Sequence, residues 1–190
     1  MRKQLFAGAV LLAVPALIAA SAVPLTFGAG SKVWVSGTST VRSWRCESTQ
    51  VSGSADAAGI ELDRVGGARG EINIPLSTLD CRNGTMNGHM RTALKAEQNP
   101  GIRFRATQVR VTPASDAEGT VAMTGQLTLA GQTRDITVNG TAVREGGALR
   151  VRGTVPLTMT DFGVQPPRLM AGTMRVHAPV TVGFDVLLRP

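Results

Sequence analysis

The triplet Asp161-Phe162-Gly163 is the first stretch of this 190-residue chain that suggests chemistry, because protein kinases bind magnesium through the aspartate of such a triplet. A kinase also needs a glycine-rich loop, a strand lysine and an HRD-type loop, and the sequence contains none of them. The triplet follows an alternating segment, residues 148–158, and precedes Pro166-Pro167. We therefore expect a strand end that turns into an irregular loop, in which Phe162 covers one end of the core and Asp161 bonds nearby backbone amides.

Two histidines, His89 and His177, are the other candidates for acid–base chemistry. Nucleophilic catalysis needs a base beside the nucleophile and a third group that orients the base, and a zinc ion needs more ligands than two histidines supply. No phosphate-binding glycine loop and no GxSxG motif occurs in the sequence. Five acidic residues lie in expected turns, where we interpret them as solvated charges: Glu61, Asp63, Asp116, Glu118 and Glu145. The sequence therefore predicts no enzyme activity, no catalytic residue, no metal site and no cofactor.

The first residues, MRKQLFAGAVLLAVPALIAASAVP, are typical of a secretory signal peptide. A short basic start precedes an apolar run without charge, and Ala20-Ser21-Ala22 fits the small-x-small cleavage pattern. An uncleaved membrane anchor is the alternative, although the apolar run is short for a span and contains Pro15. We expect an exported protein, periplasmic or else secreted, with a signal peptide at residues 1–22, a linker at 23–31 and one domain at 32–190.

The two cysteines, Cys46 and Cys81, predict a disulfide, since an exported protein with an even number of cysteines favours one. It would close a loop of about 36 residues and stabilise the fold by roughly 3–4 kcal/mol in the chain-entropy model. A metal-binding pair or a redox pair is the alternative. The CxxC spacing is absent, however, and neither histidine lies near a cysteine in the sequence.

The basic residues are scattered rather than clustered. The formal net charge is +7, and arginines alternate with apolar residues in Ile102-Arg103-Phe104-Arg105. Nucleic-acid binding favours clustered basic residues and stacking aromatic side chains, whereas this chain has no tyrosine. We therefore expect no nucleic-acid partner, but a transient contact with anionic membrane headgroups is consistent with the mildly basic surface.

Apolar and polar residues alternate along most of the chain after residue 31, which is typical of half-buried β-strands. Ala130-Gly131 separates two such segments as a hairpin turn, and Gly66-Gly67, Asn139-Gly140 and Gly146-Gly147 indicate further turns. Residues 86–96 break the alternation with apolar residues at helical spacing, so we expect one short helix there. The expected strands lie near residues 32–39, 46–55, 67–75, 102–112, 119–129, 132–144, 148–158 and 177–188.

Many strands with one apolar face and tight turns predict an antiparallel sandwich or barrel. A closed barrel of eight strands can hold one small apolar ligand. A membrane-spanning barrel would need a lipid-facing outside and aromatic girdles. Here the second face of the expected strands carries arginines, among them Arg105 and Arg150, and tyrosine is absent, so the sequence excludes that class.

The chain resembles the YceI-like family of exported polyisoprenoid-binding proteins in five stretches that occur in order: SGTSTVRSWRC, GEINIPLSTLDC, MNGHMRTALKAEQNPGIRF, GQLTLAGQTRDITV and LTMTDFGVQPP. The resemblance runs from about Lys32 to the C-terminus. It departs from the family at Arg42, where members often carry histidine, and the two cysteines mark a subset at most. The resemblance implies an all-β fold, an extended eight-stranded antiparallel β-barrel of lipocalin-like shape. It also implies a periplasmic carrier or store for a long isoprenoid chain rather than a catalyst.

In such a barrel the apolar face predicts a lumen for a polyisoprenoid or another long apolar lipid. We expect Trp34 and Trp44 near its ends, and a bulky charge at Leu127 to abolish lipid retention. The expected ligand-binding residues are Phe104, Met123, Leu127, Leu129, Val138, Val155, Leu157, Phe162, Phe184 and Val186.

Three alternatives to a lipid-binding lumen stay open. Two of them have a filled barrel, because a lumen and a filled core show the same alternation of apolar and polar residues. The same residues could simply pack against one another as a solid core. The protein could be a secreted binding or inhibitor module with a filled barrel, acting through loops such as residues 164–170. It could also be a hydrolase or isomerase for a lipid headgroup, which would place His89 or His177 beside a carboxylate at the barrel mouth.

Overall fold

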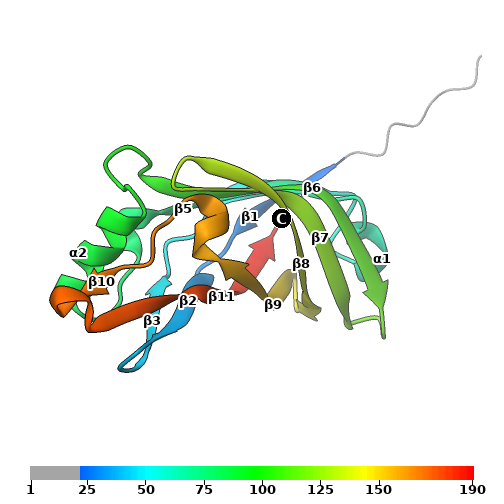
Figure 1. Cartoon of the computed structure of the whole chain (residues 1–190). Coiled ribbons are helices and arrows are strands. Elements are labelled where there is room, and N and C mark those ends of the chain that lie inside the picture. Colours follow the sequence, from blue (N-terminus) through cyan, green and yellow to red (C-terminus); the bar gives the residue numbers. More distant parts are fainter. Residues whose placement is uncertain (1–21) are drawn as a thin grey trace, which may run out of the picture.

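Runs of alternating apolar and polar residues form the long strands of the structure, a computed structural model that describes residues 22–190 (Figure 1). The strands are β1 (Val23–Phe27), β2 (Lys32–Ser39), β3 (Ser43–Ser48), β4 (Ser52–Ala57), β5 (Arg69–Pro75), β6 (Gly101–Pro113), β7 (Glu118–Leu129), β8 (Gln132–Glu145), β9 (Ala148–Thr158), β10 (Arg168–Leu169) and β11 (Met174–Arg189). The helices are α1 (Leu62–Val65) and α2 (Gly84–Ala93), with short 3-10 turns η1 (Leu76–Thr78), η2 (Met159–Phe162) and η3 (Met170–Gly172).

The strands pair into one antiparallel sheet in the order β1-β4-β5-β6-β7-β8-β9-β11-β2-β3. Strand β11 pairs with β9 along one edge, and along the other edge with β2 and then with β1, where Phe27 lies opposite Leu188. Because β1 also pairs with β4, the sheet closes on itself. The successive strands β1 and β2 act as two parts of one bent strand, as do β3 and β4. The predicted eight-stranded antiparallel barrel is therefore confirmed.

Several local expectations need correction. Residues 23–31, expected to be a linker, contain β1, whose Leu25 is buried. The strand expected at 46–55 is interrupted at residues 49–51, between β3 and β4. The interruption follows the buried Ser48, whose hydroxyl lies 2.7 Å from Thr78 Oγ1. Helix α1 was not predicted, because a single turn is too short to show helical periodicity. Residues 1–21, most of the expected signal peptide, lie outside the described residues.

Three of the four turns predicted from glycines are correct, and one is wrong. Gly66-Gly67 forms the turn that follows α1. Ala130 and Gly131 form the predicted two-residue turn between β7 and β8, both with positive φ. Gly146-Gly147 lies in the turn between β8 and β9, as predicted. Asn139-Gly140, however, lies inside β8. A side chain at Gly140 would collide with the carbonyl oxygen of Arg152, so the glycine permits close strand pairing rather than a turn.

The two ends of the barrel are built differently (Figure 1). At one end α1 buries Leu62 and Val65 against apolar residues of the barrel such as Val109. At the opposite end lie α2, β10 and η3, which pack beside the β2–β3 hairpin (Figure 1). Within residues 22–190, no helix is both long enough and apolar enough to cross a membrane.

Four charged side chains form a cluster on the outer face of β8, β9 and β11. Asp185 accepts hydrogen bonds from Arg150 Nη1 at 2.8 Å and from Arg152 Nε at 3.2 Å, and Glu145 accepts one from Arg150 Nε at 2.9 Å. Burial by itself raises the pKa of the Asp185 carboxyl. The hydrogen bonds and charges of Arg150 and Arg152 together outweigh burial, so this pKa lies below its ordinary value of 3.8.

We expect the free energy of unfolding to fall on acidification as Asp185 is protonated. Because the folded-state pKa is depressed, the unfolded chain binds this proton first. The contribution of Asp185 to the free energy of unfolding is therefore fully present above pH 3.8, the ordinary pKa of an aspartate. It is lost as the pH falls through the lower pKa of the folded state. Asp185→Asn should lower the free energy of unfolding at neutral pH by about 1–2 kcal/mol, discounted for partial exposure.

Denaturant unfolding at neutral and acidic pH measures this effect, with Asp135→Asn as a control on an exposed aspartate of β8. The acid dependence of the wild type should be steeper than that of Asp185→Asn and equal to that of the control. Parallel acid profiles for wild type and Asp185→Asn would contradict the assignment.

Candidate functional site

The inner faces of the strands enclose a cavity of about 540 Å³. This volume lies within the range of about 300–1,000 Å³ that is usual for small-molecule sites. Apolar side chains of β2, β6, β7, β8, β9 and β11 make most of its wall. The cavity extends from Val65 and Ala68 at the α1 end to Met86 and Met90 on α2. The barrel is therefore hollow rather than filled.

All ten residues that the sequence predicts to bind a ligand line this cavity. Phe104, Met123 and Leu157 are only partly buried, so they leave apolar surface facing the space inside the barrel. Leu127 and Phe162 are almost fully buried, with 8% and 2% of their surface exposed. The structure brings the ten residues together at one site, and their contact with a ligand remains a prediction.

The two tryptophans lie on opposite faces of the barrel wall. Trp44 lies on the inner face, where it packs against Gly37 and joins the apolar cluster around the cysteines. The indole of Trp34 instead lies on the outer face, against Gly183 and 4.3 Å beneath the Arg45 guanidinium. Thus Trp44 belongs to the cavity end, as expected, whereas Trp34 covers the outside of the sheet.

We call the α2 end of the cavity the mouth, which consists of α2, the β2–β3 hairpin and residues 164–176. Six polar residues line this end, and three more, Ser54, Arg69 and Glu71 of β4 and β5, border the cavity along its wall. The alternation of apolar and polar residues in the sequence could not predict the polar residues of the mouth, because they lie on a helix, at a hairpin tip and at strand ends. The Asn83 side chain does carry a readable signal, since it caps α2 by accepting from the Met86 N–H at 2.9 Å. The polar residues that line this end are Ser39, Arg42, Asn83, Thr85, His89 and Thr158.

The Asp161-Phe162-Gly163 triplet is a structural corner at this end of the barrel. Phe162 is buried against Leu127 and lines the cavity, which agrees with its expected covering role. Gly163 ends η2 in the left-handed conformation, with φ of 67°. The expectation for Asp161 was wrong: its carboxylate is exposed, and its main-chain carbonyl accepts a hydrogen bond from Arg134 Nε at 3.0 Å.

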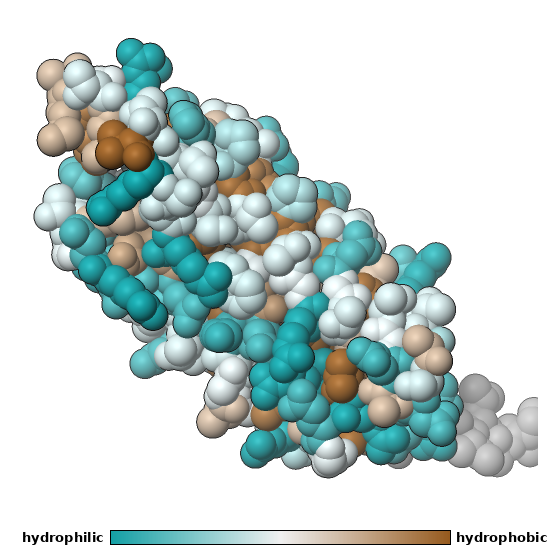
Figure 2. Space-filling model, turned by 90° about the horizontal axis from the view of Figure 1, so that it is seen from below, coloured by the Kyte–Doolittle hydropathy of each residue, from teal (hydrophilic) through white to brown (hydrophobic). Residues whose placement is uncertain are grey.

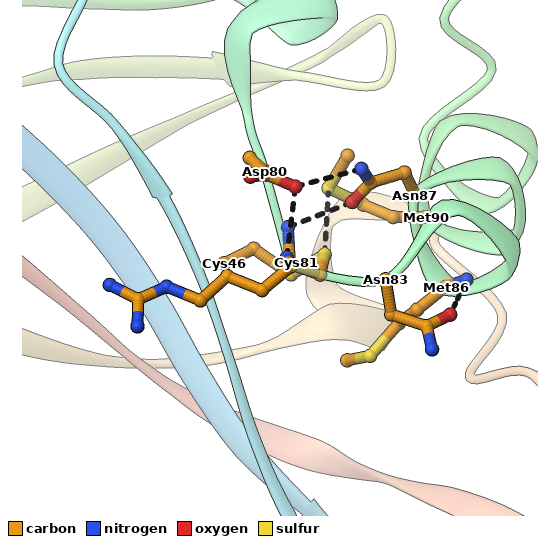
Figure 3. The surroundings of a disulfide bond; sticks show 8 residues. Cys46, Asp80, Cys81, Asn83, Met86, Asn87 and Met90 are labelled. Atoms are coloured by element: carbon orange, nitrogen blue, oxygen red, sulfur yellow. Dashed lines mark hydrogen bonds between the residues drawn. A yellow bond between two sulfur atoms is a disulfide. The ribbon is translucent and has the colours of Figure 1, made fainter.

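The predicted disulfide between Cys46 and Cys81 is present and joins β3 to the segment that follows η1 (Figure 3). Strand β3 is the last strand in the sheet order, so its free edge needs another partner. Glu47 and Asp80 supply one isolated bridge, in which each N–H donates to the other carbonyl at 2.9 Å. The disulfide and this bridge therefore join the free edge of β3 to the segment that follows β5 and η1, and they close the barrel wall there.

Side-chain hydrogen bonds hold the start of α2 beside the disulfide (Figure 3). Asn87 accepts from the Cys81 N–H at 2.8 Å and donates to Asp80 Oδ1 at 2.9 Å. The bond from Asn87, followed by the Arg82 N–H, keeps the pKa of the Asp80 carboxyl below its ordinary value. Met90 reaches the disulfide, with Sδ 4.0 Å from Cys81 Sγ. Helix α2 is thus fixed at the mouth with flexible thioether side chains on its cavity side.

The histidines are not arranged as a hydrolase would require. His177 points outward from β11, and its Nδ1 lies 2.9 Å from Thr38 Oγ1. His89 lies at the mouth, but among residues 22–190 it pairs with no carboxylate. In the same part of the chain, no three His, Cys, Asp or Glu side chains gather as metal ligands.

Comparison with known proteins places this barrel in a family. The family model of the YceI-like domain matches residues 28–188. The chain belongs to the YceI-like domain family. The resemblance inferred from the five sequence stretches is therefore confirmed, and the matched segment begins slightly before Lys32, between β1 and β2.

Two UPF0312 proteins are sequence relatives of this YceI-like chain. One, from Shewanella denitrificans, is 30% identical over 120 residues, which are 59% of this chain and 58% of the relative. The other, from Vibrio cholerae, is 29% identical over 102 residues, which are 50% of this chain and 52% of the relative. The chain therefore spans little more than half the length of each relative.

Solved structures share the barrel at low sequence identity. BcnA of Burkholderia cenocepacia has a TM-score of 0.68 and 18% identity, with 84% of this chain and 96% of that chain covered. A polyisoprenoid binding domain from Saccharophagus degradans, implicated in plant cell wall breakdown, has a TM-score of 0.66 and 14% identity, with 87% and 97% covered. At these identities the likeness establishes the shared fold.

Proposed function

We propose that this YceI-like protein is an exported, periplasmic lipid-binding protein that holds a polyisoprenoid or a similar long apolar chain in its barrel, for transport or storage. The observation that carries the proposal is the apolar cavity of about 540 Å³ along the barrel interior. The description of the Saccharophagus degradans neighbour as a polyisoprenoid binding domain supports the class of ligand. Burial of a chain contributes about 0.8 kcal/mol per CH₂ group, less the cost of ordering it.

The arrangement of polar residues supports one orientation of the bound lipid. Val65 and Ala68 line the α1 end of the cavity, whereas Arg42, Asn83 and His89 line the mouth. Arg69 and Glu71 of β5 also border the cavity, but they alternate with the inward-facing residues of that strand, so their side chains point to the outer face. An amphiphilic chain would therefore enter tail first and leave its polar end at the mouth, where hydrogen-bonding groups remain solvated.

Export is supported by two independent features. The first residues are typical of a signal peptide, and the Cys46–Cys81 disulfide suits an oxidising compartment such as the periplasm.

The filled-barrel binding module is disfavoured by the cavity itself. Its proposed loop, residues 164–170, does not offer a continuous apolar patch, because Val164 is buried and lines the cavity. Met170 alone of this loop is a highly exposed large apolar residue.

Native mass spectrometry tests the proposal on protein that has been exported in a bacterium and purified without detergent. We expect a retained adduct whose masses, after denaturing extraction, form a ladder spaced by isoprene units. A single apo mass, together with failure to take up added isoprenoids, would reject the carrier function.

A further inference from the structure

Two large apolar side chains stand out into solvent in the described part of the chain, residues 22–190. Val41 is 68% exposed and Met170 is 74% exposed. Val41 lies at the tip of the β2–β3 hairpin, and Met170 opens η3. Both elements belong to the mouth end of the barrel (Figure 1).

Hydrogen bonds join these two tips into one surface. The Thr40 N–H donates to the Arg175 carbonyl at 3.0 Å, and the Arg175 N–H donates to Thr40 Oγ1 at 3.2 Å. Thr40 Oγ1 in turn donates to the Thr173 carbonyl at 3.2 Å. We call the surface formed by residues 40–42 and 168–175 the mouth tip.

The charge of the mouth tip has one sign. The sequence contains no aspartate or glutamate in residues 36–46 or in residues 162–184. Arg42, Arg168 and Arg175 are exposed there beside the two apolar tips. Figure 2 shows apolar surface beside strongly hydrophilic residues at the left end of the molecule, the end that carries α2 and β10 in Figure 1.

The backbone presents Met170 in an uncommon conformation. Met170 and Ala171 both have positive φ, 52° and 53°, which side-chain-bearing residues adopt rarely. Conformations of this kind cluster at sites where ligands bind. The N–H and the hydroxyl of Thr173 both donate to the Met170 carbonyl, at 3.2 and 2.6 Å, so hydrogen bonds fix the turn that carries this exposed side chain.

We propose that the mouth tip docks on the surface of an anionic lipid bilayer, with Val41 and Met170 inserted at the acyl boundary and the arginines at the phosphates. The inference rests on the proposed function, because a long apolar lipid must pass between a bilayer and the cavity. Separate apolar tips flanked by basic residues suit a membrane interface. A protein partner or a second copy of the chain would instead favour a larger continuous apolar patch.

Vesicle flotation with the exported, purified protein tests the proposal. The probes are vesicles that contain phosphatidylglycerol and vesicles of phosphatidylcholine alone. We expect binding to the anionic vesicles that weakens with added salt. Arg168→Gln with Arg175→Gln should weaken it by about fivefold for each arginine. Val41→Ser with Met170→Ser should weaken it at every salt concentration.

The matched control is Arg105→Gln with Arg110→Gln, which removes the same charge from exposed positions on β6. It should change vesicle affinity less than twofold. The single variant Arg168→Gln serves if the pair is unstable, since Arg175 Nε also donates to the Gly172 carbonyl at 3.0 Å. Three results would overturn the docking surface. One is a loss of vesicle affinity in the β6 control as large as that in the Arg168 and Arg175 variants, and another is a wild type that does not bind anionic vesicles. The third is a dimer in sedimentation that Val41→Ser and Met170→Ser dissociate without any vesicle binding.

Native mass spectrometry of the same preparations separates this proposal from the proposed function. The residues substituted in the mouth tip do not line the cavity, so these variants should retain the same lipid adduct as the wild type. Retained lipid without docking rejects the mouth tip alone, whereas docking without any retained lipid rejects the carrier function alone.

Discussion

Val182→Trp is expected to prevent retention of a long isoprenoid chain while the protein stays folded. Val182 lies in the middle of β11, lines the cavity and is only partly buried, so part of its surface faces the open space. An indole at this position would fill space along the path of the chain. Excluding one isoprene unit removes about 3–4 kcal/mol of apolar burial, which corresponds to a loss of affinity of roughly hundredfold or more.

Thr181→Trp is the matched control, because the adjacent residue on β11 points outward and is exposed. It adds the same ring to the same strand without entering the cavity. Native mass spectrometry should show a full lipid adduct for Thr181→Trp and little or none for Val182→Trp, with similar thermal midpoints for both. Full adduct occupancy in Val182→Trp would place the ligand elsewhere.

The Val182 position is a sharper test than a charge at Leu127. Leu127 is only 8% exposed and packs against Phe162, Ala130 and Val164 in an apolar cluster. A charged side chain there would be buried without a partner, which costs several kcal/mol of stability. Loss of lipid in such a variant would not separate a blocked cavity from an unfolded barrel.

Alternation along the sequence was enough to predict most of the barrel wall, from β5 to β11. In β11, for example, Val182, Phe184 and Val186 face inward because successive side chains of a strand point to opposite faces. The hollow interior could not be predicted in the same way. Whether side chains from opposite walls meet depends on how many strands close the sheet and how they are tilted, which is a property of the whole barrel.

The mouth escaped prediction for a different physical reason. Its functional candidates are single residues on short or irregular elements, such as Val41 at a hairpin tip and Met170 in η3. No periodic pattern marks such residues, and their proximity arises from contacts between distant segments, such as Thr40 with Arg175. Strand β1 was missed similarly, since its Leu25 gains its burial only when β4 and β11 pair around it.

Removal of the disulfide is expected to cause the largest loss of stability among the proposed variants. Cys46 and Cys81 are 35 residues apart in sequence, and opening a loop of this size releases chain entropy worth about 4 kcal/mol. For a domain of this size the thermal midpoint should fall by about 10 °C. Scanning calorimetry of Cys46→Ala with Cys81→Ala measures the loss, and the wild type with added reductant should match it. The double variant itself should not respond to reductant.

The disulfide should also control the mouth, because it fixes the segment that holds α2. Cys81 and its neighbour Asp80 both bond Asn87 on α2, and Cys46 is the covalent link of this segment to β3. Amide hydrogen exchange in residues 84–93 should therefore accelerate in the double alanine variant more than exchange in the β7–β8 hairpin, which lacks such a link. If both regions accelerate equally, the disulfide acts only by restricting the unfolded chain. If α2 alone loosens and lipid exchanges faster, the covalent link also governs access to the cavity.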